Sequence, residues 1–217
     1  MEPRWLFDIS NPKALLVVAH PDDETIFAGG LILSSRQTHW TIVCCTTEYE
    51  QRQYEFINAC RFLAEESGNR IDPILLGLLD GQIDSGTLAK KLRPYTKGYD
   101  IVITHNKGGE YGHEDHKLVH RYLIDVIANP NTWVFISPGS TNVNQEKLKS
   151  KIPGGNFVLN LPSEIRRLKI RAFQECHVSQ ANLYGYDETG KLRNTDLQET
   201  LYWEFENLGR EEYTFYK

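Results

Sequence analysis

The chain has 217 residues, which is long enough for one domain with its own hydrophobic core, and we expect a single domain over residues 1–217. It has 40% hydrophobic and 24% charged residues and a net charge of −5, values that indicate a globular protein without a basic surface for nucleic acid. No apolar run approaches the ~20 residues needed to span a bilayer, and residues 1–5 have no signal-peptide pattern.

Short apolar runs alternate with helix-like segments from residue 14 to residue 137. The expected strands are residues 14–19, 40–46, 73–79, 100–105 and 132–137. The expected helices are residues 23–35, 51–67, 87–96 and 113–127. Because this alternation is typical of βαβ units, the sequence predicts an α/β fold with a parallel sheet and helices on both faces.

The character of the chain changes after residue 137. A further strand over residues 157–161 and a helix over 163–176 are expected beyond a polar, glycine-containing stretch. We interpret residues 14–137 as the core and 138–217 as a substrate-side and C-terminal elaboration. The aromatic-rich residues 182–217 fit either a lid over the site or a hydrophobic strand pair that covers the sheet edge.

The four cysteines have neither zinc-finger nor redox spacing, and they are Cys44, Cys45, Cys60 and Cys176. Free, buried thiols suit a reducing compartment, so we expect a cytoplasmic protein.

The first motif, Ala-His-Pro-Asp-Asp-Glu over residues 19–24, directly follows the first expected strand. Pro21 disfavours helix at His20, so the chain turns there, and the acids fall in the first turn of a helix. An ordinary acidic helix start would give the same pattern. Gly29 and Gly30, further along that helix, indicate the close approach of another group.

The second motif follows the fourth strand. A glycine-rich loop after His105 leads into His113-Glu114-Asp115-His116 at the start of a helix, where His113 and His116 share one face. Since the first and fourth strands end at the same edge of a parallel sheet, the two motifs can meet there.

Together the motifs provide the donors of a mononuclear metal site. His20, Asp23 and His116 would supply a His₂Asp set for Zn²⁺, with one position left for water. Asp22, beside the ligands, would act as a base towards that water. His113 would polarise a carbonyl group or protonate a leaving amine, and Asp115 would orient His113.

These residues resemble the LmbE-like/PIG-L family of metal-dependent N-deacetylases. Beside the two motifs, the matching positions are Thr46, Thr47, Arg52, Glu55, Leu79, Asp80, Gly81, Lys169, Ser179 and Gln180. The resemblance implies a Rossmann-like three-layer sandwich with a mostly parallel central sheet and its active site at the carboxyl edge of the strands. It also implies Zn²⁺-dependent removal of acetyl or related acyl groups from amino sugars or their conjugates.

The resemblance also assigns roles to individual residues. It makes His20, Asp23 and His116 the metal ligands, Asp22 the general base, and His113, with Asp115, the acid or oxyanion-stabilising partner. Tyr111 would assist the tetrahedral intermediate, and Arg52 and Asp80 would bind the sugar. Glu114 stands where many members have proline.

Other interpretations stay open at this point. Two histidines and a carboxylate also form the facial triad of non-haem Fe²⁺ enzymes, and Fe²⁺ or another divalent metal would suit the donors. A non-catalytic sugar-binding relative is a further alternative. A nucleotide-binding module is disfavoured because no glycine lies between the first strand and its helix. The expected partner is a small amino-sugar substrate; the oligomeric state is open, and a homo-oligomer is compatible with the sequence.

Overall fold

The protein is described here by a computed structural model, which covers residues 5–47, 49–110, 112–126, 129, 131–136, 156–183 and 210–216. Within these residues, seven strands form one sheet in the order β3-β2-β1-β4-β5-β7-β6. The strands are β1 (Lys13–Val18), β2 (His39–Thr46), β3 (Arg70–Leu78), β4 (Ile101–Thr104), β5 (Thr132–Ile136), β6 (Asn156–Asn160) and β7 (Arg210–Tyr216). Strands β1 to β5 are parallel to one another, and β7 runs antiparallel to both β5 and β6.

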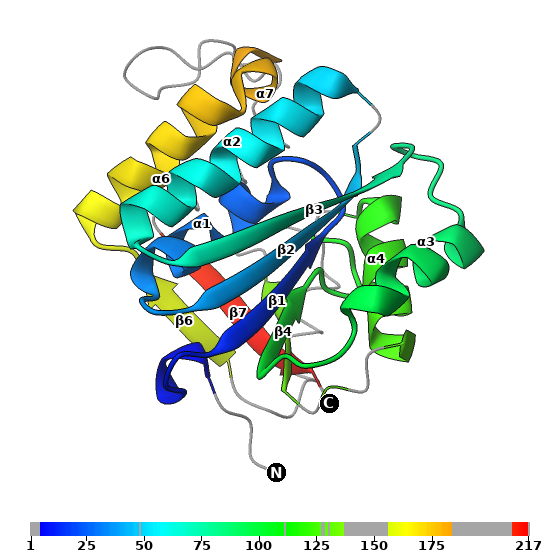
Figure 1. Ribbon diagram of the computed structural model, residues 1–217, viewed down its shortest axis with the longest axis horizontal. Helices are drawn as coiled ribbons and strands as arrows, with labels where there is room; N and C mark the ends of the chain where they lie inside the picture. Colours follow the sequence, from blue (N-terminus) through cyan, green and yellow to red (C-terminus); the bar gives the residue numbers. More distant parts are fainter. Residues whose placement is uncertain are drawn as a thin grey trace.

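Helices cover both faces of this sheet, which gives three layers (Figure 1). One face carries α1 (Asp23–Ser34), α2 (Glu50–Ser67) and α6 (Ser163–Cys176), and the other carries α3 (Ser85–Leu92) and α4 (Glu114–Val126). The short elements are α7 (Val178–Leu183) and the 3₁₀ turns η1 (Leu6–Asp8) and η2 (Arg93–Tyr95). The predicted α/β fold with a mostly parallel sheet is therefore confirmed.

Strand β1 is apolar at every position from Ala14 to Val18, and its burial explains why. Leu16 and Val18 belong to the core beneath α1, α2 and α6, whereas Leu15 and Val17 belong to the core beneath α3 and α4. Successive strand residues point to opposite faces, so a strand covered on both sides has no polar face. The central position of β1 follows directly from this pattern.

The expected elements lie within a few residues of the observed ones. The largest difference at a strand start is β3, which begins at Arg70 and runs through Pro73. Since β3 is an edge strand, a proline can be accommodated without breaking the sheet. The third expected helix ends at Leu92, and the chain continues as η2, because Pro94 cannot continue the backbone hydrogen-bond pattern.

The C-terminal part contributes to the sheet edge. Strand β7 belongs to the aromatic-rich tail and pairs antiparallel with β5 and with β6, which precedes the tail. Tyr213 of β7 is fully buried, and its hydroxyl group donates to the carbonyl oxygen of Phe27 at 2.9 Å. Residues 184–209, which hold several of the tail's aromatics, lie outside the described residues.

Three further observations concern the cysteines, the helices and the paired glycines. All four cysteines are free and buried. No helix among the described residues is long and apolar enough to cross a membrane. At Gly29 the close approach comes from a side chain: an added Cβ would lie 3.3 Å from Cγ of the buried Lys169 on α6.

The strand order also fixes where a ligand can approach. Strand β1 lies between β2 and β4, so the chain leaves β1 towards one side of the sheet and later returns on the other side. The carboxyl ends of strands at such a switch point form a crevice in open α/β sheets. The two polar motifs follow β1 and β4 and therefore flank this crevice.

Candidate metal centre

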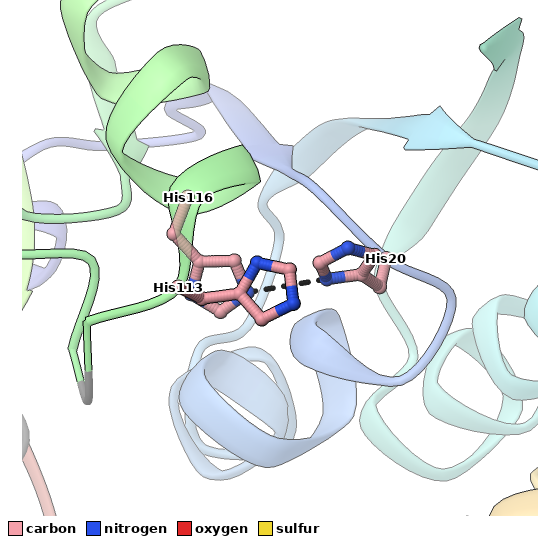
Figure 2. A group of neighbouring side chains, drawn as sticks. All are labelled: His20, His113 and His116. Carbon is pink, nitrogen blue, oxygen red and sulfur yellow. Dashed lines mark hydrogen bonds between the residues drawn. The ribbon is translucent and has the colours of Figure 1, made fainter. Parts of the chain in front are cut away.

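The residues His20, Asp23 and His116 converge at the carboxyl ends of β1 and β4. His20 follows β1, Asp23 is the first residue of α1, and His116 lies in the first turn of α4. All three are buried. Figure 2 shows the rings of His20 and His116 facing each other, with His113 beside them.

Their donor atoms are closely spaced. His20 Nδ1 lies 3.2 Å from His116 Nε2, and Asp23 Oδ2 lies 3.5 Å from His20 Nδ1 and 3.4 Å from His116 Nε2. A tetrahedral ion with bonds of about 2.0–2.2 Å separates its ligand atoms by about 3.3–3.6 Å. The spacing of these atoms therefore fits three corners of such a site.

The outer nitrogen of each ring contacts a carboxylate, so the inner nitrogen can offer a lone pair. His20 Nε2 lies 3.3 Å from Asp115 Oδ2 and 3.2 Å from Asp80 Oδ1. His116 Nδ1 lies 2.6 Å from Glu110 Oε2. A histidine whose outer N–H is held by a carboxylate is the usual arrangement of a metal ligand. The donor set therefore suits a divalent cation such as Zn²⁺.

The charges of this cluster shift the pKa values of its members. Burial alone would raise the pKa of Asp23, but the neighbouring His116 and His105 hold it well below its usual range. Burial likewise opposes protonation of His20, yet contacts with Asp115, Asp23 and Asp80 raise its pKa to about 12. The carboxylates thus favour a positive charge at His20, whereas burial and the charge of His105 lower the pKa of His116 to about 4, so that ring stays neutral and keeps a lone pair.

Other groups of side chains around the same point also lie close enough to hold an ion. They are His20 with His113 and His116, Asp23 with His105 and His116, and His20 with Asp80 and Asp115. In the second set, His105 Nε2 already accepts the backbone N–H of Ala19 at 2.9 Å, and Nδ1 lies 2.9 Å from Glu110 Oε2. These contacts engage both ring nitrogens of His105, which suits a residue that supports the site.

Asp22 lies beside the donors in an unusual backbone conformation. Its φ of +148° is in a region that L-amino acids rarely adopt. Arg52 of α2 donates from Nη2 to Asp22 Oδ2 at 3.3 Å. Burial raises the pKa of Asp22 to about 6, although the charge of Arg52 opposes this shift. A buried carboxylate that takes up a proton near neutral pH can serve as a base.

Arg52 has a further property that points to a ligand. Its Nη1 is buried and has no hydrogen-bond partner within the described part of the chain. An orphaned guanidinium donor costs folding free energy, so its presence near the crevice suits a group that arrives from outside.

The ring of His113 stacks on that of His116, with 4.8 Å between their centroids. The backbone N–H of Asp115 donates to His113 Nδ1 at 3.3 Å, which assigns the proton of a neutral ring to Nε2. Burial and the charge of His20 lower the pKa of His113. A neutral ring with its N–H at Nε2 is a hydrogen-bond donor suited to an oxyanion.

Asp115 and Asp80 lie on the other side of His20. Asp115 was predicted to orient His113. The Asp115 carboxylate accepts the Gly81 N–H at 2.8 Å and contacts His20, and the contact of Asp115 with His113 is made by its backbone N–H. Asp80 is 58% exposed, and its contact with His20 lowers its pKa to about 2. Tyr111, the remaining predicted residue, lies outside the described residues.

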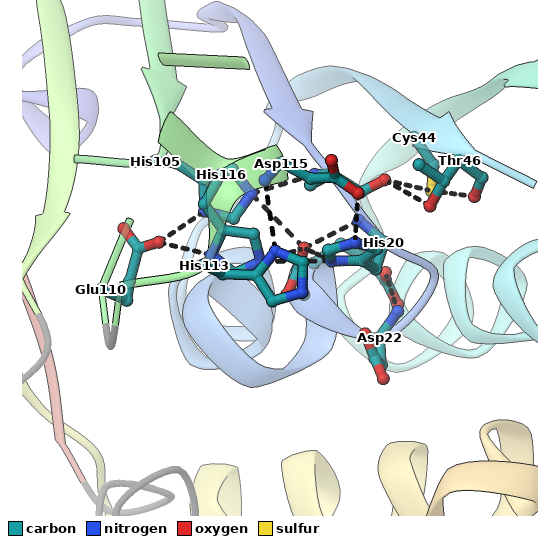
Figure 3. A network of polar contacts seen from close by, with 12 residues as sticks. His20, Asp22, Cys44, Thr46, His105, Glu110, His113, Asp115 and His116 are labelled. Atoms are coloured by element: carbon teal, nitrogen blue, oxygen red, sulfur yellow. Dashed lines mark hydrogen bonds and ion pairs between the residues drawn. The ribbon is translucent and has the colours of Figure 1, made fainter. Parts of the chain in front are cut away.

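Glu110, which was not among the predicted site residues, organises the second motif. This buried carboxylate contacts both His105 and His116, as Figure 3 shows, and it also accepts the backbone N–H of Asn106 at 2.8 Å. Glu110 stands in a loop at φ +53°, six positions before His116, so no helical or strand periodicity connects the two. An acid within a glycine-rich loop is the one signal that the sequence carries.

Two curated relatives match the chain at moderate identity. The Uncharacterized protein L374 of Acanthamoeba polyphaga mimivirus is 30% identical over 145 residues, which cover 58% of this chain and 63% of that protein. The 1D-myo-inositol 2-acetamido-2-deoxy-alpha-D-glucopyranoside deacetylase of Segniliparus rotundus is 26% identical over 168 residues, which cover 55% of this chain and 51% of the relative. The matches therefore span between half and two thirds of the relatives' length.

Solved structures show the same fold. A triple mutant of a deacetylase in the teicoplanin biosynthetic pathway superposes with a TM-score of 0.63 at 16% identity, covering 94% of this chain and 98% of that chain. The 4-carboxy-2-hydroxymuconate hydratase GalB of Pseudomonas putida gives 0.59 at 18% identity, covering 95% and 96%. The family model PIG-L, described as GlcNAc-PI de-N-acetylase, matches residues 15–127 and includes both motifs. Because that match covers more than half of the sequence, the chain belongs to the PIG-L family.

Proposed function

We propose that the protein is a Zn²⁺-dependent hydrolase that removes an N-acetyl or related acyl group from an amino sugar or its conjugate. The observation that carries this proposal is the convergence of His20 Nδ1, Asp23 Oδ2 and His116 Nε2 at 3.2 to 3.5 Å, with the Asp22 carboxylate beside them. The relative from Segniliparus rotundus, named as a deacetylase of an acetamido sugar, supports the substrate class.

A bound divalent cation would act as a Lewis acid, lowering the pKa of a coordinated water and polarising the acyl carbonyl. Asp22 accepts the proton of the attacking water on its carboxylate, while Arg52 holds Oδ2 in place. His113 donates its Nε2 hydrogen to the carbonyl oxygen as negative charge develops there. The carbon–nitrogen bond then breaks as the nitrogen gains the proton that Asp22 took from the water, which leaves a free amine and acetate.

Two further residues would bind the sugar. The buried Nη1 of Arg52, which lacks a hydrogen-bond partner among the described residues, suits a sugar hydroxyl group that approaches beside Asp22. Asp80, which is half-exposed beside His20, suits hydroxyl groups at its mouth. Tyr111 is the additional oxyanion donor that the family resemblance supplies.

The central test separates the metal ligand from the base. Asp22→Asn is expected to bind Zn²⁺ as the parent does but to lower kcat about 10²–10⁴-fold for acetate release from N-acetylglucosamine conjugates. Asp23→Asn is expected to lose the metal, which equilibrium titration with Zn²⁺ measures. If Asp22→Asn releases acetate at the parent rate, Asp22 is not the base.

A second experiment addresses the alternative of a non-haem Fe²⁺ enzyme. The metal-free protein is reloaded with Zn²⁺ alone and assayed without oxygen. Acetate release under these conditions supports hydrolysis, because an Fe²⁺ oxygenase needs both a redox-active metal and oxygen. Because a hydratase shares this fold, the assay also includes an unsaturated carboxylic acid, whose hydration in place of acetate release would contradict the proposal.

A further inference from the structure

A buried group of polar side chains connects the first turn of α1 to the start of α7. Glu24 is fully buried, and its Oε1 lies 2.8 Å from His177 Nε2 and 2.7 Å from the Thr25 hydroxyl oxygen. Its other oxygen, Oε2, accepts the backbone N–H of Asp22 at 3.0 Å. The Glu24 carboxylate therefore connects His177 to the main chain of Asp22. Glu24 and His177 are 153 positions apart in the sequence.

The Asp22 main chain needs such support. Its φ of +148° is strained for any residue with a side chain, and strain of this kind persists only where surrounding contacts hold it. The Asp22 carbonyl oxygen accepts the N–H groups of Thr25 and Ile26 at 2.9 and 2.8 Å. Its N–H is held by Glu24, so contacts fix the residue on both sides and set the direction of its carboxylate.

His177 is poorly explained by stability alone. It is fully buried between α6 and α7, and its Nδ1 has no hydrogen-bond partner among the residues that the structure describes. An apolar side chain at this position would avoid the cost of burying an unpaired ring nitrogen. The contacts that the histidine gains in return are at Nε2, which lies 2.8 Å from Glu24 Oε1 and 3.1 Å from the Thr25 hydroxyl oxygen.

We infer that Glu24 and His177 form a brace that holds the strained main chain of Asp22 and so aims its carboxylate. This inference rests on the proposed function, in which Asp22 is the base. His177 is a positioning residue: it acts through Glu24 and is distinct from the proposed metal ligands. Loss of the brace therefore lowers kcat but spares KM and metal affinity.

The test compares four variants of the full-length protein. His177→Leu removes the donor to Glu24, and His177→Asn keeps an amide that is too short to reach it. His177→Gln places its Nε2 close to the position of the histidine Nε2. Ser179→Ala is the matched control, because Ser179 lies on the same short helix but donates to Glu55 of α2 instead.

Three measurements are made on each variant: kcat and KM for acetate release, Zn²⁺ affinity by titration, and hydrogen exchange of the Asp22 amide in the metal-free protein. His177→Leu and His177→Asn are expected to lower kcat about 10- to 100-fold, because small misplacements of a reacting group have effects of this size. Their KM and Zn²⁺ affinity stay within about twofold, and their Asp22 amide exchanges at least about tenfold faster. His177→Gln restores kcat and amide protection, and Ser179→Ala changes neither.

The outcomes separate the two proposals. If the parent protein releases acetate and folded His177→Leu and His177→Asn keep its kcat, the brace has no role. Equal losses in Ser179→Ala, or no recovery in His177→Gln, also overturn it. If the parent protein releases no acetate, the proposed function fails, and the amide exchange of Asp22 then decides on the brace alone: unchanged protection in His177→Leu contradicts it.

Discussion

At the scale of single residues, Glu110 shows how one carboxylate can organise two imidazole rings. Its Oε2 lies 2.6 Å from His116 Nδ1 and 2.9 Å from His105 Nδ1. Burial would raise the pKa of Glu110, but the charge and hydrogen bond of His105, with those of His116, lower it to about 2. Glu110 therefore stays ionised inside the protein and holds His116 at Nδ1. The Nε2 atom of His116 then faces the other proposed ligand atoms, on His20 and Asp23.

Replacing Glu110 should weaken metal binding although it is not a proposed ligand. Glu110→Gln substitutes an amide for the shared carboxylate, so at least one ring loses its acceptor. Carboxylates that hold a ligand histidine typically contribute about 10–100-fold to metal affinity, and we expect a loss of that size in a chelator competition titration with Zn²⁺.

Glu114→Gln is the matched control for this prediction. Glu114 is 78% exposed and forms an ion pair with Lys117 at 2.7 Å on the same segment. Exposed pairs of this kind contribute little, so the variant should bind Zn²⁺ as the parent does. Equal affinities for Glu110→Gln and the parent would show that the position of His116 does not depend on Glu110.

Spacing in the sequence indicated which proposed ligands lie together, but it did not indicate which residues hold them in place. His20 and Asp23 stand three positions apart at a strand–helix junction, and His113 and His116 share a helix face, so local spacing brings each pair together. The contacts of Glu110 with His105, and of Glu24 with His177, connect residues with no periodic relation. Such contacts depend on the tertiary fold, and a single sequence carries no periodic signal for them.

At the scale of elements, the loop between β4 and α4 depends on a glycine. The backbone of Gly109 has a φ of +67°, and its carbonyl oxygen accepts the N–H groups of Gly112 and His113. An added Cβ would collide with the carbonyl oxygen of His113 and lie 2.9 Å from Lys117 Cγ. The loop can fold against the start of α4 only without a side chain here.

Gly109→Ala should therefore destabilise the protein more than a positive φ alone explains. Gly68→Ala at the end of α2 is the variant to compare it with. There φ is +71°, and among the described residues no heavy atom outside the local chain lies within 4 Å of the added Cβ. We expect a loss of about 1–2 kcal/mol for Gly68→Ala from backbone strain. Gly109→Ala should lose about 1–3 kcal/mol more from the collision. Denaturant unfolding measures both, and equal losses would show that the loop relaxes freely.

The elements themselves were predictable where one pattern dominated. Strand β1 was found because it is apolar from Ala14 to Val18, and the end of α2 because of Gly68. Helix α7 was not expected as an element, since its six residues are too few to show a period. Its start is stabilised by Glu55 of α2, which accepts both the N–H and the hydroxyl group of Ser179.

At the scale of the whole molecule, three distant parts of the chain meet at one point. The switch in strand order brings the ends of β1 and β4 together, and α6 with α7 lies against α1 and α2 (Figure 1). Asp22 is contacted from α1 through Glu24 and from α2 through Arg52. A buried carboxylate held in this way should affect the stability of the entire fold.

This effect should appear as a pH dependence of unfolding in the metal-free, chelator-treated protein. Burial raises the pKa of Asp22 from 3.8 to about 6, so between these pH values the folded state binds more protons than the unfolded state. Stability is then lost as pH rises through this window, on the order of 3 kcal/mol at about 1.4 kcal/mol per pKa unit. Asp22→Asn cannot ionise, so its unfolding free energy relative to the parent should increase from pH 4 to pH 7.

Asp80→Asn provides the contrasting case, because the contact with His20 lowers the pKa of Asp80 to about 2. A lowered carboxyl pKa contributes stability above the unfolded value, and that contribution is lost only as pH falls towards the folded value. The stability difference between Asp80→Asn and the parent should therefore stay constant between pH 5 and pH 7, where that for Asp22→Asn still changes as pH approaches and passes about 6. Parallel curves for Asp22→Asn and the parent would mean that Asp22 is ionised throughout this range, and the proton it is proposed to accept would then need another acceptor.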